Sequence, residues 1–202
     1  MLSRPLQVRE FYNLNQEIEI EFKNLITKEE FNRIRSYLPF PSNGELQTNY
    51  YFETNQFTLK KNHSALRIRE KNGIYTLTLK QPHKQGLLET HDPLSSEEAK
   101  KWMNNHQVST CNVTKQLDEM NIDVNDLIYY GSLTTVRLEC KDGDFIYVLD
   151  DSHYNNHSDY ELEIEAPSYE AGLEVFNRLL KTLSIPKRET PNKIKSFFDT
   201  ML

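Results

Sequence analysis

The 202-residue sequence has few of the residues that mark specialised folds. Its 2 cysteines, Cys111 and Cys140, form neither a disulfide framework nor a paired Cys/His zinc motif, so we expect free thiols. With 6 glycines, 8 prolines and no low-complexity run, neither a disordered polymer nor a repeat array is indicated. A Gly-rich phosphate loop and a Ser/His/Asp or Cys/His catalytic arrangement are also lacking. The 37% hydrophobic and 27% charged content suits a compact globular protein.

Long apolar runs are missing as well. No stretch approaches the ~20 apolar residues needed to cross a bilayer, and the segment 1–16 has no apolar signal core. We therefore expect a cytoplasmic protein without a membrane partner. The formal net charge of -6 argues against nucleic acid too, because a phosphate backbone repels an acidic surface. A small polyanion could still bind where basic residues gather at one place.

Strict alternation of charged and apolar residues predicts several strands. The segment 16–23 alternates throughout, which is typical of a strand with two unlike faces, and 159–165 repeats its acid-apolar pattern. Residues 66–80 are predicted to form a hairpin that turns at Asn72-Gly73. Further strands are predicted at 50–52, 87–91, 127–140 and 145–150. The total is seven or eight strands, mostly antiparallel.

Apolar residues at helical spacing predict helices between and after these strands. A capping box of Thr27 and Glu30 begins a helix that ends before Pro39, and a long loop is expected around Asn55 and Asn62. Further helices are predicted at 95–106, at 114–120, at 168–183 and from Pro191.

No linker rich in Gly, Pro or Ser divides the chain. We expect one domain over residues 1–202, with a short N-terminal extension at 1–14 and a helical insertion at about 94–121.

The two-faced strands admit two arrangements. In the first, the charges face water and the apolar side chains fill an ordinary sandwich or barrel core, which is the outcome that periodicity alone favours. In the second, a closed barrel holds the charges inside, and helices cover its apolar outer faces. The amphipathic helices favour the second arrangement, because their stripes need a surface to cover. The apolar faces that offer such a surface are Ile18, Ile20 and Phe22, and Tyr160, Leu162 and Ile164.

The signs of the charges also differ between strands. Carboxylates repeat on alternate positions of two strands, where they repel one another, whereas cations and hydroxyls predominate on the others. Carboxylate oxygens are hard ligands that suit Mg²⁺ or Mn²⁺. The first candidate metal ligands are Glu19, Glu21, Glu161 and Glu163, followed by Asp150 and Glu165.

The basic side chains suit phosphate, because Arg offers paired donors and Lys a movable point charge. The candidate phosphate-binding residues are Lys23, Arg67, Arg69, Lys80, Arg137 and Lys193. Positioning and electrostatics supply most of the catalysis in phosphoryl transfer, so a protein nucleophile is unnecessary. Lys23 and Lys80 are the candidate catalytic residues, and a general-base role is one possibility for Lys23.

Residues 19–23, Glu-Ile-Glu-Phe-Lys, resemble the Glu-x-Glu-x-Lys signature of the CYTH or triphosphate tunnel metalloenzyme family. The resemblance continues in the family's order through 66–69, 76–80, Arg137, 149–150, 161–165 and Lys193. It implies an α+β fold, namely a closed eight-stranded antiparallel β-barrel with helices outside, which binds a triphosphate and Mg²⁺ or Mn²⁺. In the fifth strand the family often has Arg-x-Glu, whereas this chain has Leu87-Leu88-Glu89 and so lacks one cation.

These features favour a metal-dependent hydrolase of inorganic tripolyphosphate, thiamine triphosphate or a nucleoside triphosphate, acting as a monomer or homodimer. Two alternatives stay open: an adenylate cyclase of class IV type, which needs an adenine pocket, and a non-catalytic module that binds polyphosphate or a nucleotide. The pattern does not fix which pair of Glu161, Glu163 and Glu165 holds metal. It also leaves open the roles of Glu89 and His91, of which His91 could be a pH-sensitive helper.

Overall fold

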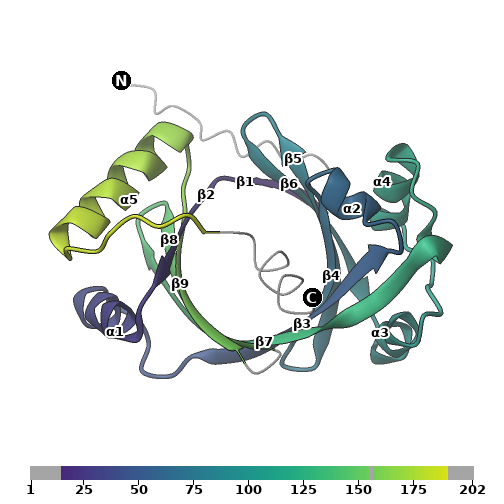
Figure 1. Ribbon diagram of the computed structural model, residues 1–202, viewed down its shortest axis with the longest axis horizontal. Coiled ribbons are helices and arrows are strands. Elements are labelled where there is room, and N and C mark those ends of the chain that lie inside the picture. Colours follow the sequence, from purple (N-terminus) through teal and green to yellow (C-terminus); the bar gives the residue numbers. More distant parts are fainter. Residues whose placement is uncertain (1–14, 155–156, 191–202) are drawn as a thin grey trace, which may run out of the picture.

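The computed structural model describes residues 15–154 and 157–190, whose strands form one antiparallel sheet curled into a barrel (Figure 1). The strands are β1 (Gln16–Glu19), β2 (Glu21–Ile26), β3 (Glu45–Thr54), β4 (Ala65–Lys71), β5 (Ile74–His83), β6 (Gly86–Leu94), β7 (Leu127–Asp142), β8 (Phe145–Tyr154) and β9 (His157–Glu165). The helices are α1 (Lys28–Tyr37), α2 (Thr58–Lys61), α3 (Ser96–Met103), α4 (Val113–Glu119), η1 (Val124–Asp126) and α5 (Tyr169–Thr182).

The barrel closes through the first two strands. The strand order is β1-β6-β5-β4-β3-β7-β8-β9-β2, so the two ends of the sheet are consecutive in the chain and are separated only by Ile20. β1 pairs with β6, where Glu19 lies opposite Leu87, and β2 pairs with β9, where Lys23 lies opposite Glu163. The predicted α+β barrel with helices outside is confirmed.

The prediction of one strand over 16–23 was wrong, and the described sheet has nine strands rather than eight. The chain changes its pairing partner at Ile20, whose carbonyl accepts a hydrogen bond from the Ala166 amide at 2.9 Å. Gly86 allows the β5–β6 turn to approach this break, because a Cβ atom there would lie 2.2 Å from the Glu19 carbonyl oxygen.

The predicted loop around Asn55 and Asn62 contains the short helix α2, which the sequence pattern missed. The buried Glu53 carboxylate accepts hydrogen bonds from the amides of Leu59 at 2.9 Å and Lys60 at 2.8 Å. This cap lies several residues before the helix, where a local capping pattern does not look for it. The capping box predicted for α1 at Thr27 and Glu30 is confirmed. The expected extension at 1–14 and the helix from Pro191 lie outside the described residues.

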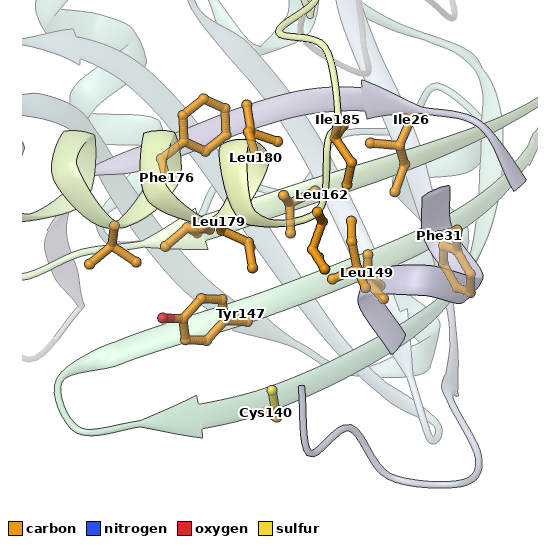
Figure 2. Close-up of a cluster of buried hydrophobic side chains, with 14 of the residues drawn as sticks. Ile26, Phe31, Cys140, Tyr147, Leu149, Leu162, Phe176, Leu179, Leu180 and Ile185 are labelled. Atoms are coloured by element: carbon orange, nitrogen blue, oxygen red, sulfur yellow. The ribbon is translucent and has the colours of Figure 1, made fainter. Parts of the chain in front are cut away.

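Helices cover the outer face of the barrel in two separate clusters. On one side α1 and α5 pack on β8 and β9, so that Phe31 and Phe176 belong to the same buried cluster as Leu149 and Leu162 (Figure 2). On the other side Trp102 of α3 and Leu117 of α4 pack against apolar side chains of β3, β4 and β5. The strand residues in this buried cluster are Phe52, Leu66, Ile68, Leu77 and Leu79. The apolar strand faces therefore point outward, and the alternate charged residues point into the barrel.

One part of the predicted outer surface differs. Phe22 packs against Phe176 of α5, with ring centroids 5.8 Å apart, as expected for an outward residue. Ile18 and Ile20, which were assigned to the same face, are only partly buried and border the internal cavity where the chain passes from β1 to β2.

The orientation of the sheet predicts unequal costs for two truncations on the outer face. Leu162→Ala should lower the free energy of unfolding by about 2–5 kcal/mol, because Leu162 is 0% exposed beneath the helices. Val136→Ala should cost less than about 1 kcal/mol, because Val136 is 36% exposed on β7. Urea unfolding measures both, and an equal loss would contradict the arrangement.

Candidate active site

The inward side chains line a cavity of about 1050 Å³ that occupies the bore of the barrel. All nine described strands contribute to its wall. The charged side chains on this wall are Glu17, Glu19, Glu21, Lys23, Arg67, Arg69, Lys80, Glu89, Arg137, Lys141, Asp144, Glu163 and Glu165. Acidic and basic residues from distant parts of the sequence therefore share one enclosed space.

Lys80 of β5 joins two carboxylates from neighbouring strands. Its Nζ atom lies 2.6 Å from Glu19 Oε2 and also contacts Glu89, which faces it across β5 and β6. Burial raises the pKa of Glu19 to about 8, although Lys80 opposes this. Burial also raises the pKa of Glu89, but attraction to Lys80 and Arg67 outweighs it and leaves that pKa well below its usual range.

Lys23 of β2 lies among three carboxylates. Its Nζ atom is 3.0 Å from Glu21 Oε2, 3.0 Å from Glu163 Oε1 and 3.8 Å from Glu161 Oε1. Burial lowers the pKa of Lys23, but Glu163, Glu21 and Glu161 together raise it well above its ordinary value. In this arrangement Lys23 is an ammonium ion that donates hydrogen bonds, which disfavours the general-base role.

Arg137 of β7 is bound by protein carboxylates. Its Nε and Nη2 atoms donate to the two oxygens of Asp150 at 2.8 and 2.7 Å, and Nη2 also donates to Glu163 at 2.8 Å. Burial disfavours the charged guanidinium, but Asp150 and Glu163 hold its pKa well above the ordinary value. Arg137 therefore joins β7, β8 and β9 and has less freedom to bind a ligand.

Arg67 and Arg69 of β4 are in a different situation. The Nε atom of Arg67 is buried and, among the described residues, has no hydrogen-bond partner, while Arg69 Nε donates to Asn49 Oδ1 at 3.2 Å. Burial lowers the pKa of Arg69 to about 9, and repulsion from Arg67 and Arg137 adds to this. Two neighbouring guanidinium groups under repulsion form a binding place for an anion with several oxygens.

The structure brings most of the predicted site residues to one place. Glu19, Glu21, Glu163 and Glu165 line the cavity, as do the predicted phosphate-binding side chains Lys23, Arg67, Arg69, Lys80 and Arg137. Asp150 and Glu161 lie against Arg137 and Lys23 and are almost fully buried. The predicted phosphate-binding residue Lys193 lies outside the described residues.

The structure brings together a second group of possible metal ligands, which the sequence pattern did not predict. One ligand atom each of Glu17, Glu89 and His91 lies within 4.8 Å of the other two. The hydroxyl of Thr78 lies 3.0 Å from His91 Nδ1, while His91 Nε2 faces Glu17 at 3.4 Å and Glu89 at 3.5 Å. The sequence pattern placed Glu89 and His91 on one side of a strand. Only the pairing of β1 with β6 adds Glu17.

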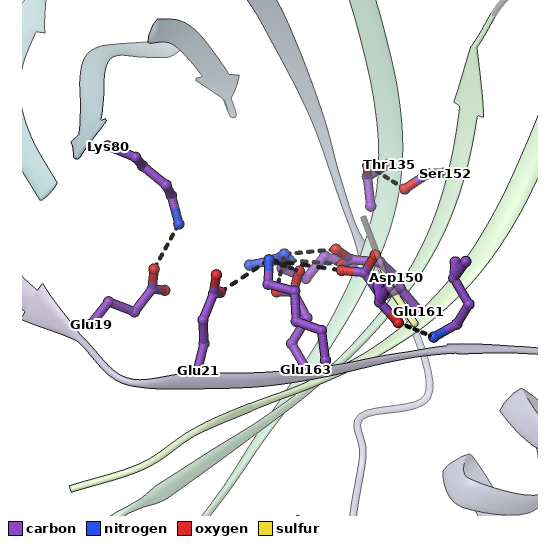
Figure 3. Close-up of polar contacts among 12 residues, drawn as sticks. Glu19, Glu21, Lys80, Thr135, Asp150, Ser152, Glu161 and Glu163 are labelled. Atoms are coloured by element: carbon purple, nitrogen blue, oxygen red, sulfur yellow. Dashed lines mark hydrogen bonds and ion pairs between the residues drawn. The ribbon is translucent and has the colours of Figure 1, made fainter. Parts of the chain in front are cut away.

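The neutral polar residues that β3 contributes to the bore were missed. Gln47, Asn49 and Tyr51 of β3 line the cavity, and the hydroxyls of Thr135 and Ser152 lie 2.9 Å apart (Figure 3). Uncharged polar residues are common at solvent-exposed positions of strands, so their pattern does not predict that they face the bore.

The donor sets fit divalent metal ions. Glu19, Glu21, Glu163 and Glu165 offer only carboxylate oxygens, which suit Mg²⁺ or Mn²⁺. The Glu17, Glu89 and His91 group adds an imidazole nitrogen, which suits Mn²⁺ or Zn²⁺ better than Mg²⁺.

The bore of the barrel holds carboxylates together with guanidinium groups that repel one another. This arrangement is typical of a tunnel protein that binds a polyvalent anion together with cations. The sequence matches the CYTH domain over residues 17–198, and the chain belongs to the CYTH family. This family comprises triphosphate hydrolases and adenylate cyclases that typically depend on a metal, and membership implies binding of a triphosphate. None of the helices within 15–154 and 157–190 has the length and apolar character of a membrane span.

Individual relatives support this assignment. The chain is 46% identical over 187 residues to a Bacillus subtilis (strain 168) protein named "Putative triphosphatase YjbK", covering 92% of this chain and 97% of that protein. A Bacillus halodurans crystal structure described as a "putative adenylate cyclase" has a TM-score of 0.88 at 45% identity, covering 92% and 100%. A Hippeastrum protein, described as a "putative adenylyl cyclase" with a dominant triphosphatase activity, has a TM-score of 0.76 at 24% identity, covering 90% and 96%. That last likeness shows the fold alone.

The raised pKa of Glu19 predicts a pH-dependent effect of Glu19→Gln. Folding raises this pKa from 4.5 to about 8, so the folded state binds extra protons in this window and its stability falls as the pH rises through it. Glutamine cannot ionise and avoids that loss. In metal-free buffer the stability of the variant relative to the wild type should rise by roughly 1–3 kcal/mol between about pH 6 and about pH 9.

Urea unfolding in the presence of a chelator measures this difference at both pH values. Glu97→Gln, at an exposed position of α3, serves as the control and should show no such change. The interpretation fails when the Glu19→Gln stability difference is the same at both pH values.

Proposed function

We propose that the protein hydrolyses a triphosphate with the help of Mg²⁺ or Mn²⁺. The observation that carries the proposal is the pair Arg67 and Arg69, two partly buried arginines that face the same cavity as the carboxylates of β1, β2 and β9. A chain of phosphates would relieve their mutual repulsion. The candidate substrates are inorganic tripolyphosphate, thiamine triphosphate and a nucleoside triphosphate.

The basic and acidic side chains of the bore would have different roles. Arg67, Arg69 and Lys80 would bind phosphate oxygens, with Arg137 and Lys193 as further phosphate-binding candidates. Glu19, Glu21, Glu163 and Glu165 would hold the metal, and Asp150 and Glu161 are the remaining candidate ligands. When bound, the metal would neutralise charge on the phosphoryl group and acidify a water molecule.

In the proposed reaction, a water oxygen bonds to the terminal phosphorus while the bond from that phosphorus to its bridging oxygen breaks. The protons of the water pass to the released phosphate and the solvent, and the bridging oxygen leaves with the rest of the substrate. Lys23 and Lys80, as ammonium ions, would stabilise the negative charge that builds up on these oxygens. Charge stabilisation is therefore the catalytic role we propose for both lysines.

The nearest alternative is an adenylate cyclase, because the Bacillus halodurans relative is described as one. A cyclase needs an apolar or stacking surface for adenine. Among the described lining residues Tyr51 is the one tyrosine, phenylalanine or tryptophan, and its ring is buried against Leu133 and Tyr154. This arrangement favours hydrolysis, as does the name of the Bacillus subtilis relative.

A binding module without turnover is the third candidate. Leu87 lies opposite Glu19, where the family resemblance led us to expect a cation nearby, so the bore offers one fewer positive charge. We also propose that residues 1–202 form one domain, that α3 and α4 belong to an insertion at about 94–121, and that the protein acts as a monomer or homodimer.

A substrate panel tests the activity directly. Phosphate release should require Mg²⁺ or Mn²⁺ and occur with at least one of the three triphosphates. Glu21→Gln should lower kcat/KM by about 100-fold or more, because Glu21 is a proposed metal ligand. Analysis of the ATP products distinguishes ADP and phosphate from cyclic AMP and diphosphate. Tight calorimetric binding without turnover at any pH would instead indicate the binding module.

The two kinds of arginine predict opposite losses. Arg67→Met should weaken metal-free binding of tripolyphosphate at least about tenfold with little loss of stability, because the buried Nε atom of Arg67 has no hydrogen-bond partner among the described residues. Arg137→Met should instead lower the free energy of unfolding by about 3–5 kcal/mol, because the buried Asp150 and Glu163 carboxylates lose the guanidinium that pairs with both. Calorimetry and urea unfolding measure the two effects, and a reversed pattern would refute the assignment.

A further inference from the structure

The two lysines of the bore lie between carboxylates that belong to different strands. Lys80 joins Glu19 of β1 to Glu89 of β6, and Lys23 joins Glu21 of β2 to Glu163 of β9. The side chains of Lys80, Glu19 and Glu89 are 17%, 18% and 6% exposed, so solvent screens the contact only weakly. Each ammonium therefore holds the oxygens that would otherwise be available to a metal.

The Glu19 and Glu89 carboxylates cannot bind the Lys80 ammonium and a divalent cation at the same time. Mg²⁺ or Mn²⁺ binds carboxylate oxygens directly, and a positive charge a few ångströms away repels it strongly in a poorly screened site. Lys80 and a divalent ion thus compete for Glu19 and Glu89.

We propose that Lys80 is an exchangeable counter-ion, which must leave Glu19 and Glu89 before these carboxylates can hold a divalent cation. The freed ammonium then turns toward the phosphate chain. The exchange itself concerns only cation binding, whereas the second step rests on the proposed function.

The surroundings of Lys80 allow such a movement. Its cross-strand neighbour on β4 is the small residue Ala65, and Arg67 follows Ala65 on the same face of that strand. A lysine has a flexible four-carbon stem that can move its charge within the cavity. Lys23 is the weaker candidate, because it contacts three carboxylates rather than two.

One consequence is coupling between the two ligands. A metal ion that displaces Lys80 adds a positive group to the phosphate-binding wall, so each ligand should increase the affinity for the other by the same factor. Lys80 would thereby make the binding of metal and triphosphate cooperative.

Calorimetric titration with Mn²⁺ alone tests the exchange. Lys80→Met removes the competing charge and should tighten Mn²⁺ binding about tenfold or more. Lys80→Arg keeps the charge and should leave the affinity at or below the wild-type value. Lys71→Met is the matched control, since it removes an ammonium that pairs with Glu45 at the exposed end of β4, and it should change nothing.

Unchanged or weaker Mn²⁺ binding by a folded Lys80→Met variant would overturn the proposal. Should that variant be unfolded without metal, the rise in Tm on adding Mn²⁺ replaces the titration: a larger rise than in the wild type supports the exchange, and an equal or smaller one overturns it. The titration requires no turnover. If the wild type hydrolyses triphosphate but Lys80→Met leaves the Mn²⁺ affinity unchanged, the exchange alone is refuted. If Lys80→Met tightens Mn²⁺ binding but the wild type hydrolyses no triphosphate, the proposed activity alone is refuted.

Discussion

Charged side chains can occupy the bore of a barrel only when opposite charges neutralise them, and the structure depends on this constraint. Lys80 neutralises charge at Glu19 and Glu89, and Arg137 does the same at Asp150 and Glu163. Removing either cation would leave an excess of buried negative charge, which is far more costly than losing an exposed ion pair. These contacts also join strands that lie far apart in the sequence, so charge pairing and barrel closure support each other.

The same constraint separates structural cations from those available to a ligand. Arg137 pairs with Asp150 and Glu163, whereas Arg67 and Arg69 repel each other and the buried Nε atom of Arg67 has no hydrogen-bond partner among the described residues. A folded protein tolerates such a pair at a cost in stability, and an anion that binds there recovers that cost as affinity. The carboxylates show the corresponding feature, because attraction to Lys80 opposes but does not cancel the effect of burial, which raises the pKa of Glu19 to about 8.

Departures from the family pattern lie close together in the bore. Leu87 stands where a cation was expected, and it faces Glu19 on the strand that also carries Glu89 and His91. Glu17 joins the latter two to form a mixed oxygen and nitrogen group at this wall. The wall near β1 and β6 is therefore richer in possible metal ligands and poorer in phosphate-binding cations than the resemblance implies.

The sequence by itself determined the strands, the capped helices and the two faces of each strand, because side-chain alternation and capping are local properties. The acidic run of β9 and the arginines of β4 were evident from their spacing alone. Only the tertiary structure decided which carboxylate meets which cation, that the first strand breaks at Ile20, and that Glu17 approaches His91. Those outcomes depend on strand register and barrel closure, which join residues many positions apart and leave no mark in the local pattern.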